Sequence, residues 1–169
     1  MTAPVAILIG PPGAGKSTVG ALLAAHLAVG FTDTDAEVEL VAGKPVSDIF
    51  IEDGEPTFRE LERTAVARAL ADSGGVVAVG GGAVLDPGTQ ESLAGRPVVY
   101  LETGFATAAR RVGLGQARPL IAGNPRATLK ALLEQRLPIY QRLARITVPT
   151  DERAAEDIAA EIARQLTPA

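Results

Sequence analysis

The sequence contains no cysteine and a single histidine among its 169 residues. Without cysteine the chain can form no disulfide, no thiolate nucleophile and no cysteine zinc site. The one histidine, His26, excludes a histidine-rich metal cluster. No apolar run approaches the roughly 18 residues of a membrane-spanning helix, and no basic leader precedes the first short apolar run. We therefore expect neither redox nor zinc chemistry, no membrane partner and a cytoplasmic location.

Lysine is also scarce, with three lysines against thirteen arginines at a net charge of -4. The acidic balance argues against a general nucleic-acid binder. Residues 31–62 hold ten acids against two bases, a net charge of -8, whereas residues 96–153 hold ten bases against four acids, a net charge of +6. Arginines from the second half could hold an anionic ligand, and carboxylates from the first half a cation or a hydroxyl-rich ligand. For most of these charges, however, solvated helix faces are the better explanation.

Short apolar runs rich in valine and isoleucine alternate with longer helical patterns. The runs predict strands at 5–9, 31–32, 76–79, 98–101 and 146–148, and their continuous apolar character is typical of a buried parallel sheet. Helices are expected after Lys16, from about 56 to 72, from 126 to 143 and from 153 to 166. On the first helix we place His26 in the core, and on the third we place Leu137 inward with Leu129 and Tyr140.

The alternation of strands and helices predicts a three-layer α/β fold with right-handed crossovers. Hydrophobic residues make up 47% of the chain, which is enough for one compact domain with its own core. The sequence has no internal repeat and no linker, so we expect a single domain over residues 1–169. In such a fold ligands bind at the carboxyl ends of the strands.

A phosphate-binding loop follows the first strand directly. The sequence GPPGAGKST at 10–18 matches the G-x-x-x-x-G-K-[ST] pattern between a strand and a helix, the context that this motif requires. Its glycines let backbone N–H groups turn toward phosphates, and the new helix adds its positive end. We expect Lys16 to reach the β- and γ-phosphates and Ser17 to ligate Mg²⁺. The expected ATP-binding residues of the loop are Gly13, Ala14, Gly15, Lys16, Ser17 and Thr18.

Four further motifs follow in order. They are Asp33-Thr34-Asp35, GEPTFRELE at 54–62, Gly80-Gly81-Gly82 and Ala117-Arg118-Pro119-Leu120. In this order and spacing they resemble the shikimate kinase family over residues 5 to about 153. The resemblance implies a P-loop NTPase fold of the nucleoside monophosphate kinase type, with five parallel strands in the order 2-3-1-4-5 and a mobile lid at about 112–125. It also implies transfer of the ATP γ-phosphoryl group to the 3-hydroxyl of shikimate, with ADP as product.

The resemblance also implies where the acceptor and the ions bind. Asp33 would hold one Mg²⁺ ion through its water shell, and Asp35 would bind the acceptor hydroxyl and orient it or take its proton. Two carboxylates that cap and begin a helix are the alternative for this pair. The turn at Gly80, Gly81 and Gly82 would lie against shikimate, within a site that draws on residues 33–62.

Several arginines complete the expected site. Arg59 is flanked by acids, so surface ion pairs explain it, but Glu62 lies on the apolar stripe of its helix and needs a partner. A carboxylate that fixes Arg59 for bidentate binding of the shikimate carboxylate accounts for both residues. Arg136 lies seven residues after Leu129 on the inward face, where it is either a snorkelling side chain or a second carboxylate ligand.

Three more arginines are expected at the nucleotide. Arg118 in the lid would close over the phosphates and neutralise charge in the transition state. Arg111 would contact adenine, with a solvated helix end as the alternative, and Arg153 matches a nucleotide-contacting position. The expected catalytic residues are therefore Lys16, Asp35 and Arg118, in a protein that we expect to act as a monomer.

Two other functions remain open at this stage. One is another small-molecule kinase of the same fold, such as gluconate kinase, which should lack paired arginines beside a Gly-Gly-Gly turn. The other is a nucleotide-dependent switch that binds ATP without an acceptor. No N-K-x-D guanine signature is present, which weakens a GTPase interpretation.

Overall fold

A computed structural model describes residues 3–113 and 124–166. One sheet of parallel strands forms its centre in the order β2-β3-β1-β4-β5, as the resemblance implied. The strands are β1 (Ala6–Ile9), β2 (Phe31–Asp33), β3 (Val76–Ala78), β4 (Val98–Glu102) and β5 (Ile146–Pro149). Strand β1 is the middle strand, with Ile7 level with Val77 on one side and Val98 on the other.

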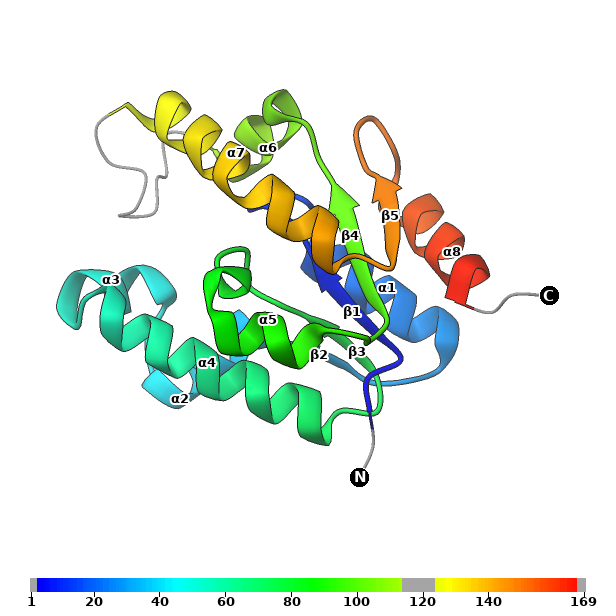
Figure 1. Cartoon of the computed structure of the whole chain (residues 1–169), viewed down its shortest axis with the longest axis horizontal. Helices are drawn as coiled ribbons and strands as arrows, with labels where there is room; N and C mark the ends of the chain where they lie inside the picture. The colour runs from blue at the N-terminus through cyan, green and yellow to red at the C-terminus, as the bar shows by residue number, and fades with distance from the viewer. Residues whose placement is uncertain (1–2, 114–123, 167–169) are drawn as a thin grey trace.

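Helices cover both faces of this sheet (Figure 1). They are α1 (Lys16–Leu27), α2 (Thr34–Ala42), α3 (Val46–Glu52), α4 (Glu55–Asp72), the 3-10 helix η1 (Ala83–Leu85), α5 (Pro87–Leu93), α6 (Phe105–Val112), α7 (Pro125–Leu143) and α8 (Ala155–Leu166). The sequence predicted α1, α4, α7 and α8, with ends that differ by a residue or two. It did not predict α2, α3, α5 or α6.

The central strand divides the core into two layers. Ala6 and Leu8 pack with buried side chains of α1 and α8, whereas Ile7 and Ile9 pack with those of α4 and α7. Alternate residues of a strand point to opposite faces, so a continuous apolar strand supplies both layers at once. This explains why the three middle strands, β3, β1 and β4, appear in the sequence as apolar runs.

Two core assignments from the sequence are wrong, and both lie on helix faces. His26 is exposed, because the face of α1 that meets the core is centred on Val19, Gly20, Leu23 and Ala24. Gly20 lets Phe31 approach closely, since a Cβ there would lie 2.4 Å from the phenyl ring. Leu137 is 39% exposed, while its neighbour Arg136 is buried at 3% exposure.

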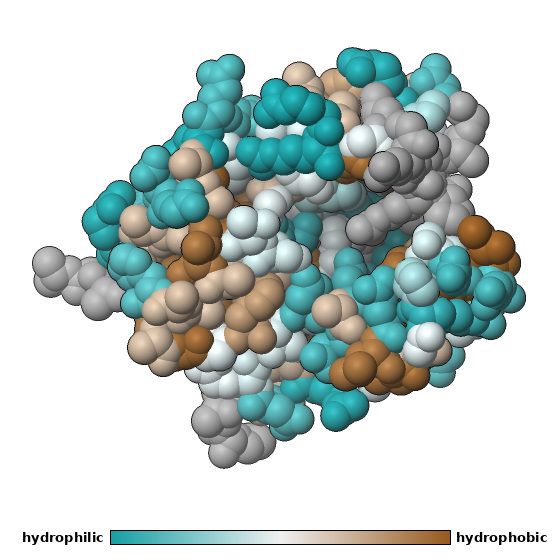
Figure 2. Space-filling view, turned by 180° about the vertical axis from the view of Figure 1, so that it is seen from behind, coloured by the Kyte–Doolittle hydropathy of each residue, from teal (hydrophilic) through white to brown (hydrophobic). Residues whose placement is uncertain are grey.

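The outer surface mixes polar and apolar side chains, as the view from behind shows (Figure 2). Among the described residues, the large apolar side chains with the highest exposure are Leu40, Val41 and Ile51. None of the helices within residues 3–113 and 124–166 is long and apolar enough to cross a membrane.

Candidate active site

The phosphate-binding loop lies between the carboxyl end of β1 and the first turn of α1. Gly10, Gly13 and Gly15 all have positive φ values, of 154°, 82° and 90°, which glycine adopts without strain. A Cβ at Gly13 would lie 3.0 Å from the carbonyl oxygen of Ala108, so α6 packs closely against the loop. Lys16 spans the loop and donates through Nζ to Gly10 O at 2.8 Å and to Pro11 O at 3.1 Å.

The loop opens into a cavity that we call the nucleotide cavity. Its lining residues are Pro12, Gly13, Gly15, Lys16, Ser17, Thr18, Asp33, Asp35, Ala78, Val79, Gly80, Gly81 and Arg111. Ala14 is not part of this lining and is buried, at 1% exposure, so the structure does not place it at the cavity surface. The cavity thus joins the phosphate-binding loop to the ends of β2 and β3.

Asp33 has two partners at the start of α2. One carboxylate oxygen accepts from the backbone N–H of Asp35 at 2.9 Å and from that of Ala36 at 3.4 Å, so Asp33 caps the helix as the alternative interpretation expected. The other oxygen accepts from the hydroxyl of Ser17. Capping uses one oxygen only, so it does not exclude a second function for the other.

The Ser17 and Asp33 oxygens fit a magnesium ion. A hydroxyl and a carboxylate are hard oxygen ligands, and Mg²⁺ binds through one or two such groups together with waters and substrate phosphates. Within residues 3–113 and 124–166 no group of three or more histidine, cysteine, aspartate or glutamate side chains is arranged to hold a metal on its own. The donor set therefore suits an ion that arrives with a nucleotide.

A second cavity, which we call the acceptor cavity, lies beside the first. Its lining residues are Pro12, Asp35, Phe50, Phe58, Arg59, Glu62, Gly81, Gly82, Leu132 and Arg136. Pro12, Asp35 and Gly81 line both cavities. Asp35, in the first turn of α2, is therefore the acidic side chain at the boundary between a phosphate-binding region and the acceptor cavity.

Two arginines from different helices meet in the acceptor cavity. Arg59 comes from α4 and Arg136 from α7. A Cβ at Gly82 would lie 2.7 Å from Nη1 of Arg59 and 3.1 Å from Nη2 of Arg136, so both guanidinium groups reach the same glycine. Nε of the buried Arg136 has no hydrogen-bond partner in the part of the chain that the structure describes. Two cations this close favour an anion between them, and a planar carboxylate matches guanidinium geometry.

Glu62 is the buried partner of this arginine pair. Its carboxylate accepts from Nη1 of Arg59 at 2.8 Å, and its side chain is 4% exposed. Burial raises the pKa of Glu62, while the charge and hydrogen bond of Arg59 oppose this rise. Arg59 also donates to Glu55 at 3.3 Å and lies 5.3 Å from the Phe58 ring centre. These contacts fix the guanidinium from three sides.

Side chains from three helices pack closely against the Gly80-Gly81-Gly82 turn. A Cβ at Gly80 would lie 2.7 Å from Oδ1 of Asp35 and 2.8 Å from Oε2 of Glu62. The N–H of Gly80 donates to the Thr34 hydroxyl at 3.1 Å, which ties the turn to α2. The turn therefore brings the functional groups of α2, α4 and α7 close together.

Three expected nucleotide residues have different positions. Arg111 lines the nucleotide cavity, and its Nη1 donates to Gly13 O at 3.1 Å and to Ala14 O at 3.3 Å. Arg153 pairs with Glu161 at 2.8 Å and donates to Pro149 O, and it does not line the nucleotide cavity. Arg118 and most of the expected lid lie outside the described residues.

Sequence reasoning missed some residues around these cavities. Phe50 comes from α3, a short helix that was not predicted, and its ring lies 4.7 Å from that of Phe58. The apolar positions of the sequence VSDIFIE at 46–52 were the available signal for this helix. Thr34 was read only as the middle of the Asp-Thr-Asp motif, yet it is fully buried and holds the glycine turn.

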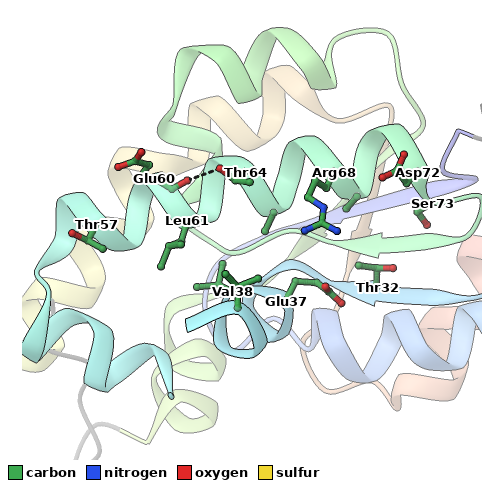
Figure 3. Close-up of a pocket in the computed structure, with 13 residues that line it drawn as sticks. Thr32, Glu37, Val38, Thr57, Glu60, Leu61, Thr64, Arg68, Asp72 and Ser73 are labelled. Carbon is green, nitrogen blue, oxygen red and sulfur yellow. Dashed lines mark hydrogen bonds between the residues drawn. The ribbon is translucent and has the colours of Figure 1, made fainter. Parts of the chain in front are cut away.

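A separate groove of about 370 Å³ runs between α2 and α4 (Figure 3). Its lining includes Val38, Leu61, Thr64 and Arg68, and Figure 3 shows Arg68 pointing from α4 toward α2. The groove shares no lining residue with the nucleotide or acceptor cavity. The predicted site residues therefore lie outside this groove, in the two cavities at the ends of the strands.

Comparison with known proteins agrees with this arrangement. The family model described as shikimate kinase matches residues 12–167. A shikimate kinase of Thermobifida fusca is 63% identical over 163 residues, which cover 96% of this chain and 95% of that protein. The solved structure of a shikimate kinase from Acinetobacter baumannii in complex with shikimate superposes with a TM-score of 0.91 at 36% identity, covering 98% of this chain and 93% of the other.

A gluconokinase from Sinorhizobium meliloti shares the fold alone. Its structure superposes with a TM-score of 0.56 at 19% identity, covering 98% of this chain and 91% of that one. Sequence identity and structural similarity are both lower than for the shikimate kinases.

Proposed function

The chain belongs to the shikimate kinase family and is an ATP-dependent kinase that phosphorylates shikimate, and we propose that the two cavities described above bind the two substrates. The product is shikimate 3-phosphate, an intermediate in the synthesis of aromatic amino acids. ATP binds in the nucleotide cavity, and shikimate binds at the acceptor cavity, which has a volume of about 20 Å³ in this structure and widens to admit the ring. The shikimate 3-hydroxyl then faces the γ-phosphoryl group across Asp35.

The observation that carries this assignment is the meeting of Arg59 and Arg136 at Gly82. A buried guanidinium whose Nε lacks a partner is costly unless a ligand supplies one. The shikimate carboxylate supplies a planar acceptor for both arginines, while Glu62 holds Arg59 in place. With its carboxylate held there, the ring can direct a hydroxyl toward Asp35, which borders both cavities.

Asp35 acts on the reacting hydroxyl. The hydroxyl oxygen forms a bond to the γ-phosphorus as the bond to the β–γ bridging oxygen breaks, and the hydroxyl proton passes to Asp35 or is held by it during transfer. Because the transition state for phosphoryl transfer is loose, orientation of the hydroxyl contributes more than early removal of its proton. The turn at Gly80, Gly81 and Gly82 provides a close backbone surface for the ring.

The nucleotide is held by the phosphate-binding loop. The backbone of Gly13, Ala14 and Gly15 lies against the phosphates, with the N–H of Ala14 also donating to Pro11 O at 3.1 Å and with Lys16 and the first turn of α1 beside it. Ser17 and Asp33 would hold one Mg²⁺ ion, with Asp33 acting through the water shell of the ion, and Thr18 completes the first turn. When bound, this ion neutralises charge on the β- and γ-phosphates.

Three arginines outside the acceptor cavity contact the nucleotide. Arg118 closes over the phosphates, Arg111 contacts the nucleotide beside the loop that it already supports, and Arg153 contacts the adenine side. Residues 1–169 form a single domain that acts as a cytoplasmic monomer, without a nucleic-acid or membrane partner.

The assignment of function is tested by ADP release from Mg-ATP with shikimate, quinate, gluconate and nucleoside monophosphates offered separately. We expect turnover with shikimate. Turnover with gluconate but not with shikimate would instead indicate the other small-molecule kinase, and nucleotide binding without turnover on any acceptor would indicate a switch protein.

The assignment of the carboxylate site is tested by Arg59→Ala. Loss of charge-assisted hydrogen bonds should raise the KM for shikimate by about 10- to 100-fold, with the KM for ATP within about two-fold. Arg63→Ala is the matched control on the same helix, because Arg63 is half exposed and forms a 3.8 Å ion pair with Asp86 away from the cavity. Equal kinetic effects of the two substitutions would contradict the assignment.

A further inference from the structure

The phenol of Tyr140 connects the glycine turn to Arg136. Tyr140 is 1% exposed, and its hydroxyl donates to Gly81 O at 2.7 Å. Arg136 lies four residues earlier on α7, so the two side chains lie on the same helix face. A Cβ at Gly81 would lie 3.4 Å from Nη1 of Arg136 and 3.2 Å from Cδ of Pro12 in the phosphate-binding loop. The hydroxyl of Tyr140 therefore holds the same glycine that the guanidinium of Arg136 approaches.

The surroundings of Tyr140 keep its ring in place. The ring stacks on that of Tyr100, with centroids 5.2 Å apart and planes inclined by 19°. Burial raises the pKa of Tyr140 to about 12, so the hydroxyl remains a donor at neutral pH. Pro138 lies inside α7 between Arg136 and Tyr140 and has no backbone N–H, so the helix lacks one of its own hydrogen bonds here. Side-chain contacts consequently matter more for the position of this part of α7.

We infer that Tyr140 is a positioning residue for shikimate binding, and that its hydroxyl sets the position of Arg136 relative to the Gly80-Gly81-Gly82 turn. Tyr140 does not line the acceptor cavity, so it acts through these two neighbours rather than on the substrate itself. The inference rests on the proposed role of Arg136 as a ligand of the shikimate carboxylate. A tyrosine that only fills the core would stabilise the fold without affecting one substrate more than the other.

The two stacked tyrosines offer a matched pair of variants. Tyr140→Phe removes the hydroxyl and keeps the ring. Tyr100→Phe makes the same change in the ring stacked against it, at a residue that is 3% exposed and whose hydroxyl forms no hydrogen bond within the described residues. For each full-length variant, shikimate and ATP are varied separately in a steady-state assay, and the melting temperature is measured.

We expect Tyr140→Phe to raise the KM for shikimate by about 3- to 10-fold, the effect of losing one buried hydrogen bond, with the KM for ATP within about two-fold. Tyr100→Phe should leave both KM values within about two-fold of those of the unchanged protein. The inference is overturned if the two variants have the same shikimate KM, or if Tyr140→Phe raises both KM values equally.

A double-variant cycle with Arg136→Gln separates this inference from the proposed function. If Tyr140 acts through Arg136, Tyr140→Phe should change the shikimate KM by less than about two-fold once Arg136 is already replaced. An undiminished effect in that background overturns the inference alone. If Arg136→Gln by itself leaves the shikimate KM unchanged, the proposed carboxylate site is wrong, and the inference falls with it.

Discussion

Gly82→Ala tests whether the position of Arg59, rather than its presence, determines shikimate binding. The added Cβ would lie 2.7 and 2.8 Å from the two terminal nitrogens of Arg59 and 3.1 Å from Nη2 of Arg136. All three atoms are ends of long side chains. Gly82 has φ of -94° and ψ of -6°, which alanine adopts without strain. The substitution should therefore move the guanidinium groups and leave the backbone in place.

The size of this movement follows from contact distances. Ordinary van der Waals contact for a Cβ begins at 3.4 Å, so the nearest atom of Arg59 must retreat by about 0.7 Å. Such a shift would lengthen a hydrogen bond of about 2.9 Å to about 3.6 Å, beyond the useful range. Losing one charge-assisted hydrogen bond to the shikimate carboxylate costs about 1.5 to 3 kcal/mol, or roughly 10- to 150-fold in KM.

Stability should change little in comparison. Replacing glycine by alanine lowers the entropy of the unfolded chain and so favours the folded state by about 0.4 to 1 kcal/mol, which offsets part of the cost of displacing the Arg59 side chain. We expect a melting temperature within about 4 °C of that of the unchanged protein. Gly30→Ala is the control, because a Cβ at Gly30 meets no atom within 4 Å and this glycine has no positive φ.

The assay measures ADP release, first with shikimate varied at saturating Mg-ATP and then with Mg-ATP varied at saturating shikimate. Gly82→Ala should raise the KM for shikimate and leave the KM for ATP within about two-fold of its original value. Gly30→Ala should leave both KM values unchanged. A folded Gly82→Ala protein with an unchanged shikimate KM would refute the reasoning, because the guanidinium displacement would then have no effect on binding.

Three further substitutions test single residues. Asp35→Asn should lower kcat by about 100-fold or more while shikimate still binds, and near-normal turnover would remove Asp35 from the transfer step. Asp33→Asn keeps a good helix cap, so the melting temperature should stay within about 4 °C of that of the unchanged protein. The Mg²⁺ concentration for half activity should rise about 10-fold or more. An unchanged Mg²⁺ requirement would contradict the metal assignment. Burial raises the pKa of Glu62 above its usual 4.5, so its contribution to stability falls as pH rises above that value. The melting-temperature advantage of the unchanged protein over Glu62→Gln should therefore shrink from pH 4.5 to 7, and a growing advantage would show that the Arg59 ion pair dominates.

The sheet was predictable because its strands are apolar on both faces. Runs such as VAILI and VVYL are too short for most helices, and all of their residues except Val5 are buried, so their pattern indicates a parallel sheet between helices. The strand order could not be predicted from the apolar runs and was implied instead by the resemblance of the motifs to a known family. Nothing in composition or spacing distinguishes the order 2-3-1-4-5 from other parallel orders.

The short helices were missed for a physical reason. Helix α2 has nine residues and α3 has seven, and each packs by only a few side chains, so a hydrophobic repeat has little length in which to show itself. A better signal was the cap at Asp33, whose side chain accepts from the next turn. Helix capping and metal binding by Asp33 are not alternatives, because its carboxylate has two oxygens and one can serve each role.

The inward face of α7 shows how far helical periodicity reaches. At about 100° per residue, Arg136 and Tyr140 each lie about 20° from Leu129 around the helix, whereas Leu137 lies about 80° away. Periodicity alone therefore places Arg136 at the centre of the buried face, and it is 3% exposed while Leu137 is 39% exposed. The prediction that Leu137 points inward is wrong because its angle around the helix, not its apolar side chain, determines which face it lies on.

The acceptor cavity differs from the rest of the core because charged residues occupy buried positions there. Glu62 and Arg136 occupy core-facing positions on two helices where leucine would cost less to bury, and Gly82 stands where any Cβ would displace two guanidinium groups. Each departure lowers stability unless a ligand or partner compensates it, and the partial compensation present is specific: Glu62 neutralises Arg59, while Arg136 keeps Nε without a partner. A substrate carboxylate would complete this set, which is why the same few residues carry the case for shikimate.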